Sequence, residues 1–314
     1  MVTRDLWRGA EVRWIGPERK RQGVRLRPGD HGVVLDAGRH QVTSFSAMQS
    51  VEVARSPRAG RGVTVRLTGG VEVSVPRKHL EIVPPDHPLA PEPDGTLADW
   101  WRQQLLPWGS QGIAVGAFVP SSFPAVCQVL HPWRGQGPQP IGWRQLAADC
   151  GFDSVAALDR SREAFSIPAA HDGGLSASPG ELEQTMAATL VDVLSEGTTT
   201  PDDVFVAVWE GWGDVPTQRF PGAAHLDTQA RRHFLLRGPL GGVLTSVAAS
   251  HHHRSAAGLW WPADRAWFVS TEIDLEWTFV AGSDELVDRL IDEERLEAAR
   301  TTFDAAANRA AQPS

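Results

Sequence analysis

The stretch "LWWPADRAWFVSTEIDLEW" (residues 259–277) packs four of the chain's 13 tryptophans into one short segment. From residue 267 to residue 280, apolar and polar side chains alternate. A period of two is typical of a β-strand, in which alternate side chains share a face. The pattern predicts one long strand over residues 265–282, with one face in the core. That face holds Trp267, Val269, Thr271, Ile273, Leu275, Trp277 and Phe279.

The opposite face of this predicted strand presents three carboxylates in a row, Glu272, Asp274 and Glu276. Neighbouring side chains on one face lie about 7 Å apart, so their charges repel. Three alternatives could compensate these charges. They are solvent, an arginine of the segment "RRHFLLRG" such as Arg232 or Arg237, and a divalent cation or basic partner. Oxygen ligands suit magnesium, calcium or manganese. Because no further ligands follow at a defined spacing, we expect no metal site and no cofactor.

Around this stretch, predicted helices and strands interleave, which favours an α+β domain over residues 96–300 with a largely antiparallel sheet. One helix has a predicted capping box at Ser178 and Glu181 and ends at Gly197. Residues 301–314 are predicted to be a frayed tail. The other predicted helices cover residues 96–107, 142–151, 153–165 and 283–303, and the other predicted strands cover 112–119, 125–130, 203–211 and 231–238.

The segment "VPPDHPLAPEPDG" (residues 83–95) has five prolines in 13 positions. That density excludes a helix or a central strand, so residues 84–95 are predicted to form an extended linker. Residues 1–83 read as about five short strands with glycine-bearing turns, including a hairpin at Thr68-Gly69-Gly70. Closing such strands into a small antiparallel β-barrel removes exposed edges. The predicted architecture is therefore a barrel, a linker and an α+β domain.

Two sets of residues resemble known families. "LRPGDHGVV" and "VTVRLTGGVEVSVPRKHLEIV" resemble small barrels of the Src-homology-3-like, KOW and Tudor type, which implies a binding module for peptide, protein or nucleic acid. "TPDDVFVAVWEGWG" and "LWWPADRAWFVSTEIDLEWTFVAGS", with smaller blocks between residues 112 and 300, resemble a family of uncharacterised actinobacterial proteins. The second resemblance implies a shared fold and no assigned activity.

The net charge of −8 conceals a division along the chain. Residues 1–85 hold 15 Lys and Arg against 8 Asp and Glu, whereas the remaining residues hold 15 against 30. A basic module joined to an acidic one predicts charged partners. Two distant cysteines and no apolar leader or membrane-length segment favour free thiols and a cytoplasmic protein that does not bind membranes.

Two groups of residues are candidates for a site. The first group has carboxylates for acid and base chemistry, Glu210 and Asp214 in the loop "VWEGWGD" together with Glu272 and Asp274, with Trp212 and Glu276 as binding residues. The second group is the basic run "ERKRQGVRLR", with Arg19, Lys20, Arg21 and Arg25, which suits nucleic-acid phosphates or an acidic protein surface. The triplet His251–His253 reads as a polar loop, because adjacent side chains of an extended chain alternate in direction.

The sequence contains no phosphate-binding loop, dinucleotide fingerprint, nucleophile elbow or zinc-protease motif. We therefore expect a non-catalytic binding protein, in which the acidic α+β domain is the recognition platform, the basic barrel is an accessory module and a protein is the main partner. The alternatives are a hydrolase, possibly dependent on a divalent metal, that uses the carboxylates, and an immunity-type inhibitor of a basic toxin.

Overall fold

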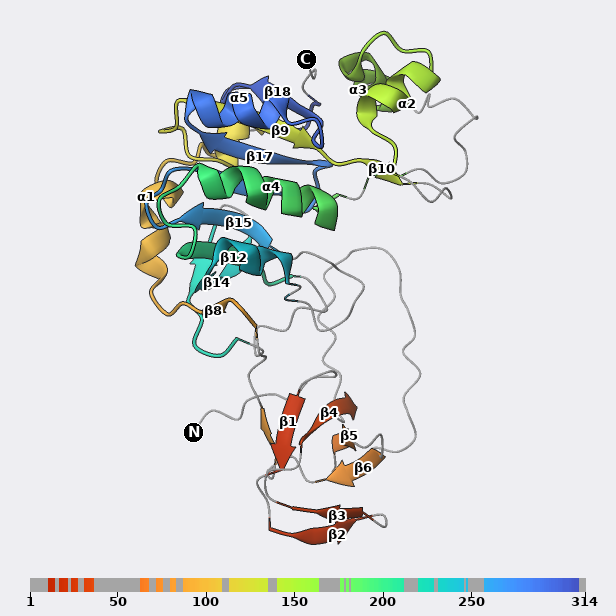
Figure 1. Ribbon diagram of the computed structural model, residues 1–314, viewed down its shortest axis with the longest axis vertical. Helices are drawn as coiled ribbons and strands as arrows, with labels where there is room; N and C mark the ends of the chain where they lie inside the picture. The colour runs from red at the N-terminus through yellow and green to blue at the C-terminus, as the bar shows by residue number, and fades with distance from the viewer. Residues whose placement is uncertain are drawn as a thin grey trace. The chain divides into compact units, whose positions relative to one another are not determined.

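The computed structural model divides the chain into two compact units (Figure 1). One consists of Met1–Asp86 with Gln218–Pro221, the N-terminal unit, and the other of His87–Thr217 with Gly222–Ser314, the α+β unit. The structure describes residues 11–14, 17–21, 24–27, 31–36, 63–67, 72–75, 80–82, 87–108, 113–134, 140–163, 176–177, 179–180, 182–211, 220–228, 231–245, 247 and 257–310.

The N-terminal unit contains a five-stranded antiparallel sheet of order β6-β5-β4-β1-β7 and a separate hairpin of β2 and β3. The first strand pairs with the last, and β5 and β6 form the predicted hairpin. Within the described residues the sheet is open, because β6 and β7 remain its two edges. The closed barrel of the sequence prediction is therefore not shown. The strands are β1 (Glu11–Trp14), β2 (Arg19–Arg21), β3 (Val24–Leu26), β4 (His31–Asp36), β5 (Val63–Leu67), β6 (Glu72–Val75) and β7 (Leu80–Ile82).

The α+β unit is built on a nine-stranded sheet in which every pairing is antiparallel. Its order is β13-β14-β12-β15-β16-β17-β9-β18, and β8 adds to β14. This confirms the predicted mixed α and β class with an antiparallel sheet. The strands are β8 (Ala90–Pro91), β9 (Ala125–Leu130), β12 (Val204–Trp209), β13 (His225–Asp227), β14 (Arg232–Gly238), β15 (Ala257–Pro262), β16 (Phe268–Thr271), β17 (Trp277–Gly282) and β18 (Ala298–Thr301).

Helices cover both faces of this sheet because its central strands are apolar on both sides. The helices α4 (Gln184–Glu196) and α5 (Asp284–Asp292) lie across one face (Figure 1). The opposite face is covered by η2 (Gly95–Ala98), α1 (Asp99–Arg102), η3 (Val115–Ala117), α2 (Trp143–Asp149), α3 (Val155–Glu163) and residues 303–310. The remaining elements are β10 (Trp133–Arg134), β11 (Ser176–Ala177) and η6 (Leu240–Leu244).

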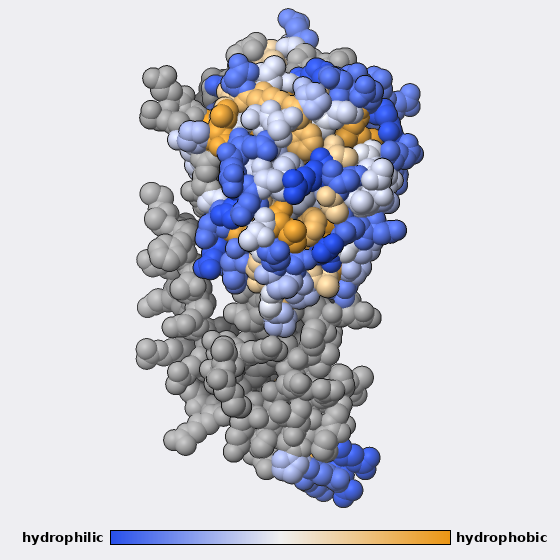
Figure 2. Space-filling view, turned by 90° about the vertical axis from the view of Figure 1, so that its left-hand side faces the viewer, coloured by the Kyte–Doolittle hydropathy of each residue, from blue (hydrophilic) through white to orange (hydrophobic). Residues whose placement is uncertain are grey.

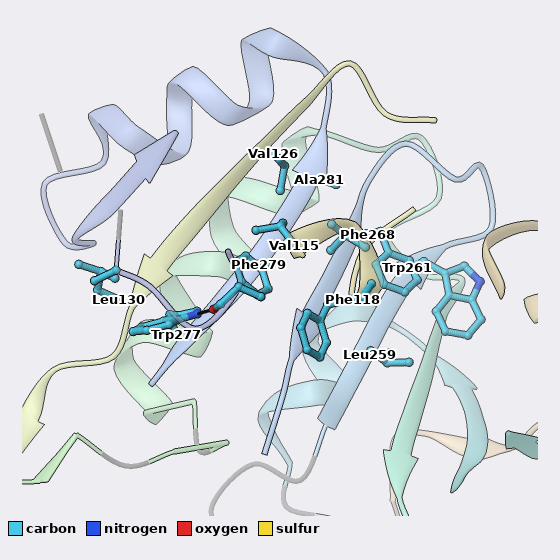
Figure 3. Close-up of a cluster of buried hydrophobic side chains, with 14 of the residues drawn as sticks. Val115, Phe118, Val126, Leu130, Leu259, Trp261, Phe268, Trp277, Phe279 and Ala281 are labelled. Carbon is cyan, nitrogen blue, oxygen red and sulfur yellow. Dashed lines mark hydrogen bonds between the residues drawn. The ribbon is translucent and has the colours of Figure 1, made fainter. Parts of the chain in front are cut away.

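The core cluster on the second face is rich in aromatic side chains. Figure 3 shows Leu130 and Trp277 at one end of the cluster and Trp261 at the other. Trp261 stacks on Phe205 and Phe268 at centroid distances of 5.6 and 5.9 Å. Aromatic pairs in this range add to the gain from burial. The four tryptophans of the opening stretch are all buried, as predicted for Trp267 and Trp277.

The single long strand predicted over residues 265–282 is wrong, because the chain turns back after Thr271. β16 and β17 form an antiparallel hairpin in which Thr271 lies opposite Thr278. A strand over residues 267–280 would extend about 46 Å, whereas no strand of this sheet exceeds seven residues. Ile273 and Leu275, predicted to be core, lie in the turn and are only half-buried.

The segments beside this hairpin also differ from the predictions. Residues 112–119 were predicted as a strand but contain the 3-10 helix η3. The capping box at Ser178 and Glu181 is wrong, because α4 begins only at Gln184 and Glu183 caps it by accepting hydrogen bonds from Thr185 N and Met186 N. Gly180 instead has a φ of +67° and donates its N–H to Leu275 O at 2.9 Å, which holds the turn of the hairpin.

Both ends of the α+β unit pack against its sheet and core more closely than the sequence predicts. Part of the predicted linker joins the sheet, since β8 pairs with β14, and Leu89 beside it is 2% exposed. The helix predicted to reach residue 303 ends at Asp292, and β18 follows it. The predicted frayed tail is ordered up to residue 310, because Ala307 is buried and donates its N–H to Ile113 O. Gly197 ends α4 as predicted, and Ser283 caps α5 by accepting a hydrogen bond from Leu286 N.

Candidate functional site

A pocket opens where β12 and β16 end and where β14 and β15 begin, under α1 and η3. Its free volume of about 40 Å³ suits one or a few water molecules or a small chemical group. Phe118 and Leu259, labelled in Figure 3, form part of its apolar wall. The lining residues are Trp101, Leu105, Trp108, Ala117, Phe118, Gly180, Trp209, Thr228, Arg231, His233, Gly258, Leu259, Ser270, Thr271, Glu272 and Ile273.

The charged group of this pocket is Arg231 with two carboxylates of the β16–β17 turn. Arg231 Nε and Nη2 donate to Glu272 Oε1 at 3.1 and 2.8 Å, and Nη2 donates to Asp274 Oδ2 at 2.5 Å. The guanidinium also lies over the Trp209 ring, 5.4 Å from its centroid, at a distance typical of a cation–π contact. One arginine therefore compensates two of the three carboxylates that the sequence placed in a row.

Glu272 and Asp274 differ in their surroundings although they share Arg231. The Glu272 side chain is 11% exposed and the Asp274 side chain is 75% exposed. Burial raises the pKa of Glu272, and its hydrogen bonds with Arg231 offset that effect only in part. Asp274 remains a surface carboxylate. The two groups are thus a buried and an exposed partner of the same cation.

Two buried polar groups in the pocket lining make no hydrogen bond with any described residue. Trp101 is fully buried, and its Nε1–H has no partner. His233 is 6% exposed, and its Nδ1 has no partner. Burial lowers the pKa of His233 to about 4, and the positive charge of Arg231 adds to this effect. His233 is therefore neutral near pH 7.

An open groove of about 580 Å³ adjoins the pocket and shares Leu105 and Thr228 with it. Its other lining residues are Asp99, Arg102, Gln103, Pro107 and Asp227. Arg102 donates to Asp99 Oδ1 at 3.2 Å and to Asp227 O at 3.0 Å, so it ties α1 to β13. Figure 2 views the side of the molecule that carries α1 and shows apolar patches among hydrophilic residues there.

The remaining predicted carboxylates do not join Glu272 and Asp274 in these contacts. Glu210 accepts a hydrogen bond from His225 and lies 3.7 Å from Arg232 Nε. Glu276 is half-buried, and its backbone oxygen accepts from His131 N at 2.9 Å. Trp212 and Asp214 lie outside the described residues. The acid and base pair predicted from Glu210 and Asp214 therefore stays a prediction.

An arginine of "RRHFLLRG" does compensate the acidic turn, but it is neither Arg232 nor Arg237. Arg232 pairs with Glu210 and Asp227, and Arg237 pairs with Glu92 and Asp203. The partner is Arg231, the first residue of "RRHFLLRG", which lies just before β14. Two adjacent arginines of an extended chain point to opposite sides. The sequence "RR" therefore indicates that only one of the two arginines faces the acidic turn, but it does not show which one.

The basic candidates lie in the N-terminal unit. Lys20 and Arg25 are exposed, and Arg25 Nε is 3.3 Å from Glu18. Arg19 and Arg21 belong to β2, and their side chains are not described. Nucleic-acid binding by these four residues stays a prediction.

Across the described ranges, no group of three or more His, Cys, Asp or Glu side chains could hold a metal ion. His251–His253 lie outside those ranges. In the described part of the chain, no helix has the length and apolar character needed to cross a membrane. Both cysteines are free, Cys127 buried and Cys150 half-buried.

Comparison with known proteins finds no matching family model, curated protein or solved structure. The resemblances stated from the sequence blocks therefore stay predictions, and function has to be argued from the pocket itself.

Proposed function

We propose that the α+β unit is a non-catalytic recognition unit, whose pocket and groove together hold a basic segment of a protein partner. The observation that carries the proposal is the Arg231 group. Glu272 and Asp274 are both hydrogen-bonded to this arginine, which fixes the wall of the pocket. This arrangement suits recognition better than a reaction in which a carboxylate has to exchange protons freely. The groove has the volume of a ligand site, and the adjoining pocket can hold a small group of the ligand below the surface.

Charge supports a basic partner. Residues 86–314 hold 30 Asp and Glu against 15 Lys and Arg. The site itself is also acidic, because the pocket and groove and their ion-pair partners hold five carboxylates and three arginines: Asp99, Glu210, Asp227, Glu272 and Asp274 against Arg102, Arg231 and Arg232. Such complementarity steers a basic segment toward the groove and speeds association. An immunity-type inhibitor of a basic toxin is one form of this proposal.

The N-terminal unit is proposed as an accessory binding module of the small-barrel type. The pairing of its first strand with its last supports a barrel-like course of the chain. Its excess of Lys and Arg supports an anionic partner, either nucleic acid or an acidic protein surface. A cytoplasmic location is consistent with the two free cysteines.

A hydrolase is the second candidate, because burial raises the pKa of Glu272 inside a pocket. A carboxyl group with a raised pKa is the usual general acid of such enzymes. This candidate predicts turnover of a chromogenic ester, amide or glycoside by the full chain, with loss of that turnover in Glu272→Gln. We expect no turnover in either protein.

The recognition proposal is tested by panning the full-length protein against a library of random dodecapeptides. We expect enriched peptides to be rich in Lys and Arg and to bind more weakly as salt rises. Gly258 lines the pocket, so Gly258→Leu should remove binding by filling it. Gly241→Leu is the matched control, because an added Cβ there meets no atom within 4 Å. Failure to enrich any peptide, or equal binding to Gly258→Leu, would contradict the proposal.

A further inference from the structure

We propose that the inner end of the pocket binds an uncharged carboxamide, whose oxygen accepts hydrogen bonds from Trp101 and His233 and whose NH₂ group donates to Glu272. This inference rests on the proposed function and names the chemical group that the partner inserts. In a protein partner, the matching group is the side chain of Asn or Gln.

Trp101 supplies the first donor. An indole nitrogen can only donate a hydrogen bond, and the Trp101 Nε1–H is buried without a partner. The ring is fixed by Trp261 and Phe268, at centroid distances of 5.5 and 5.2 Å. A buried polar group without a partner is costly and uncommon in folded proteins. A ligand that brings an acceptor removes this cost, so the pocket selects an acceptor atom.

His233 supplies the second donor. The ring is neutral near pH 7, so one of its nitrogens carries a proton. Buried N–H groups without partners are rarer than unpaired acceptors. We therefore assign the proton to Nε2, leaving the buried Nδ1 as the unpaired acceptor. A methyl group added to Gly258, which lines the pocket, would lie 3.8 Å from His233 Nε2, so the donating edge of the ring lies beside the pocket.

Charge and size select among ligands that carry an acceptor. Arg231 is already shared by Glu272 and Asp274, so the group has a net charge of −1 and repels a carboxylate or a phosphate. An amidinium or ammonium group has no acceptor for Trp101. A carboxamide is neutral and carries both an acceptor and donors. Its few atoms match a free volume of about 40 Å³, while the rest of the partner lies in the adjoining groove.

The test uses three probes of nearly the same shape, namely benzamide, benzoate and benzamidine, which are neutral, anionic and cationic. Each is titrated into the full-length ¹⁵N-labelled protein, and the indole N–H resonance of Trp101 is followed. Trp101→Phe identifies that resonance. We expect benzamide to shift it and to bind at least about tenfold more tightly than either charged probe. Trp101→Phe should weaken benzamide about fivefold through loss of one hydrogen bond.

A matched pair of glycine variants tests the place of binding. Gly258→Ala should weaken benzamide, because its methyl group narrows the pocket beside His233 at ordinary contact distances. Gly241→Ala should bind benzamide like the wild type. Tighter binding of benzoate or benzamidine, unchanged binding in Gly258→Ala, or no shift of the Trp101 resonance with benzamide would each overturn the carboxamide assignment. The peptide panning experiment tests the recognition proposal separately. If basic peptides bind but benzamide does not, the recognition proposal stands and only the carboxamide assignment is wrong.

Discussion

Three buried tryptophans at the two ends of the core cluster differ in their hydrogen bonds. At one end, Trp143 donates to His131 O at 2.8 Å and Trp277 donates to Ala307 O at 2.9 Å. At the other end, the Trp101 N–H has no partner among the described residues, and the neighbouring His233 Nδ1 also lacks one. Folding alone favours satisfied polar groups. The difference therefore distinguishes Trp143 and Trp277, which are fixed in the closed core, from Trp101, which lines the pocket where binding is expected.

The largest effect is expected at the end of the cluster that holds Trp277. Trp277→Ala removes a side chain that is 3% exposed, together with its hydrogen bond, so it should lower the free energy of unfolding by about 3–5 kcal/mol. Urea unfolding followed by far-UV circular dichroism measures the change. Trp108→Ala is the control, since Trp108 is 37% exposed and should cost far less. Equal losses in the two variants would contradict the assignment of Trp277 to the core.

The next effect is the pH dependence of stability at the pocket end. The pKa of His233 is about 4 in the fold against 6.5 as its ordinary value, so the unfolded chain binds the proton more readily. The contribution of His233 is thus fully present above pH 6.5 and is lost as the pH falls toward 4, by about 3 kcal/mol.

His233→Gln removes this titration. The difference in unfolding free energy between wild type and variant should be largest above pH 6.5 and should shrink toward pH 4. Urea unfolding at several pH values measures it. A difference that stays constant across this range would show that His233 titrates normally in the fold.

A smaller effect is expected from the pair of Arg231 and Glu272. Arg231→Gln leaves Glu272, which is 11% exposed, without its cation and should destabilise the fold by about 2 kcal/mol at pH 7. The double variant Arg231→Gln with Glu272→Gln should regain at least half of that loss, because no buried charge remains. Asp274→Asn, at a carboxylate that is 75% exposed, should cost at most about 0.5 kcal/mol. Additive single effects in the cycle would contradict the coupling.

The smallest effect compares the two ends directly. Trp277→Phe and Trp101→Phe each remove an indole ring system of a buried tryptophan, but only Trp277 loses a hydrogen bond and leaves Ala307 O unpaired. Trp277→Phe should therefore be the more destabilising by about 1 kcal/mol. Thermal and urea unfolding of the two variants measure this difference, and the reverse order would remove the distinction between the ends.

Local patterns predicted most of the α+β unit because they record burial directly. The largely apolar runs at 125–130 and 204–208 are strands inside the sheet, and Ser283 caps α5 with its side-chain oxygen. The prediction from alternation was wrong over residues 267–280. Apolar and polar residues continue to alternate through the turn between β16 and β17, so the pattern reads as one strand. A period of two identifies a strand but does not show where it reverses.

The site was only partly visible in the sequence. The acidic turn was recognised, and a structural arginine was among its expected partners, but Arg231 lies 41 residues from Glu272. Trp101 and His233 were missed, because a missing hydrogen bond is a property of the packed core. No spacing of residues signals it.

The position of β9 also determines when this unit can fold. β9 pairs on one side with β17 and on the other with β18, strands that follow it by about 150 residues or more. Gln128 of β9 then donates to Arg309 O, and Trp277 to Ala307 O. During synthesis, β9 leaves the ribosome long before its neighbours exist, and such distant pairings make folding slow. The apolar edges of β9 therefore stay unpaired during synthesis, and the sheet cannot be completed until residue 310 has been made.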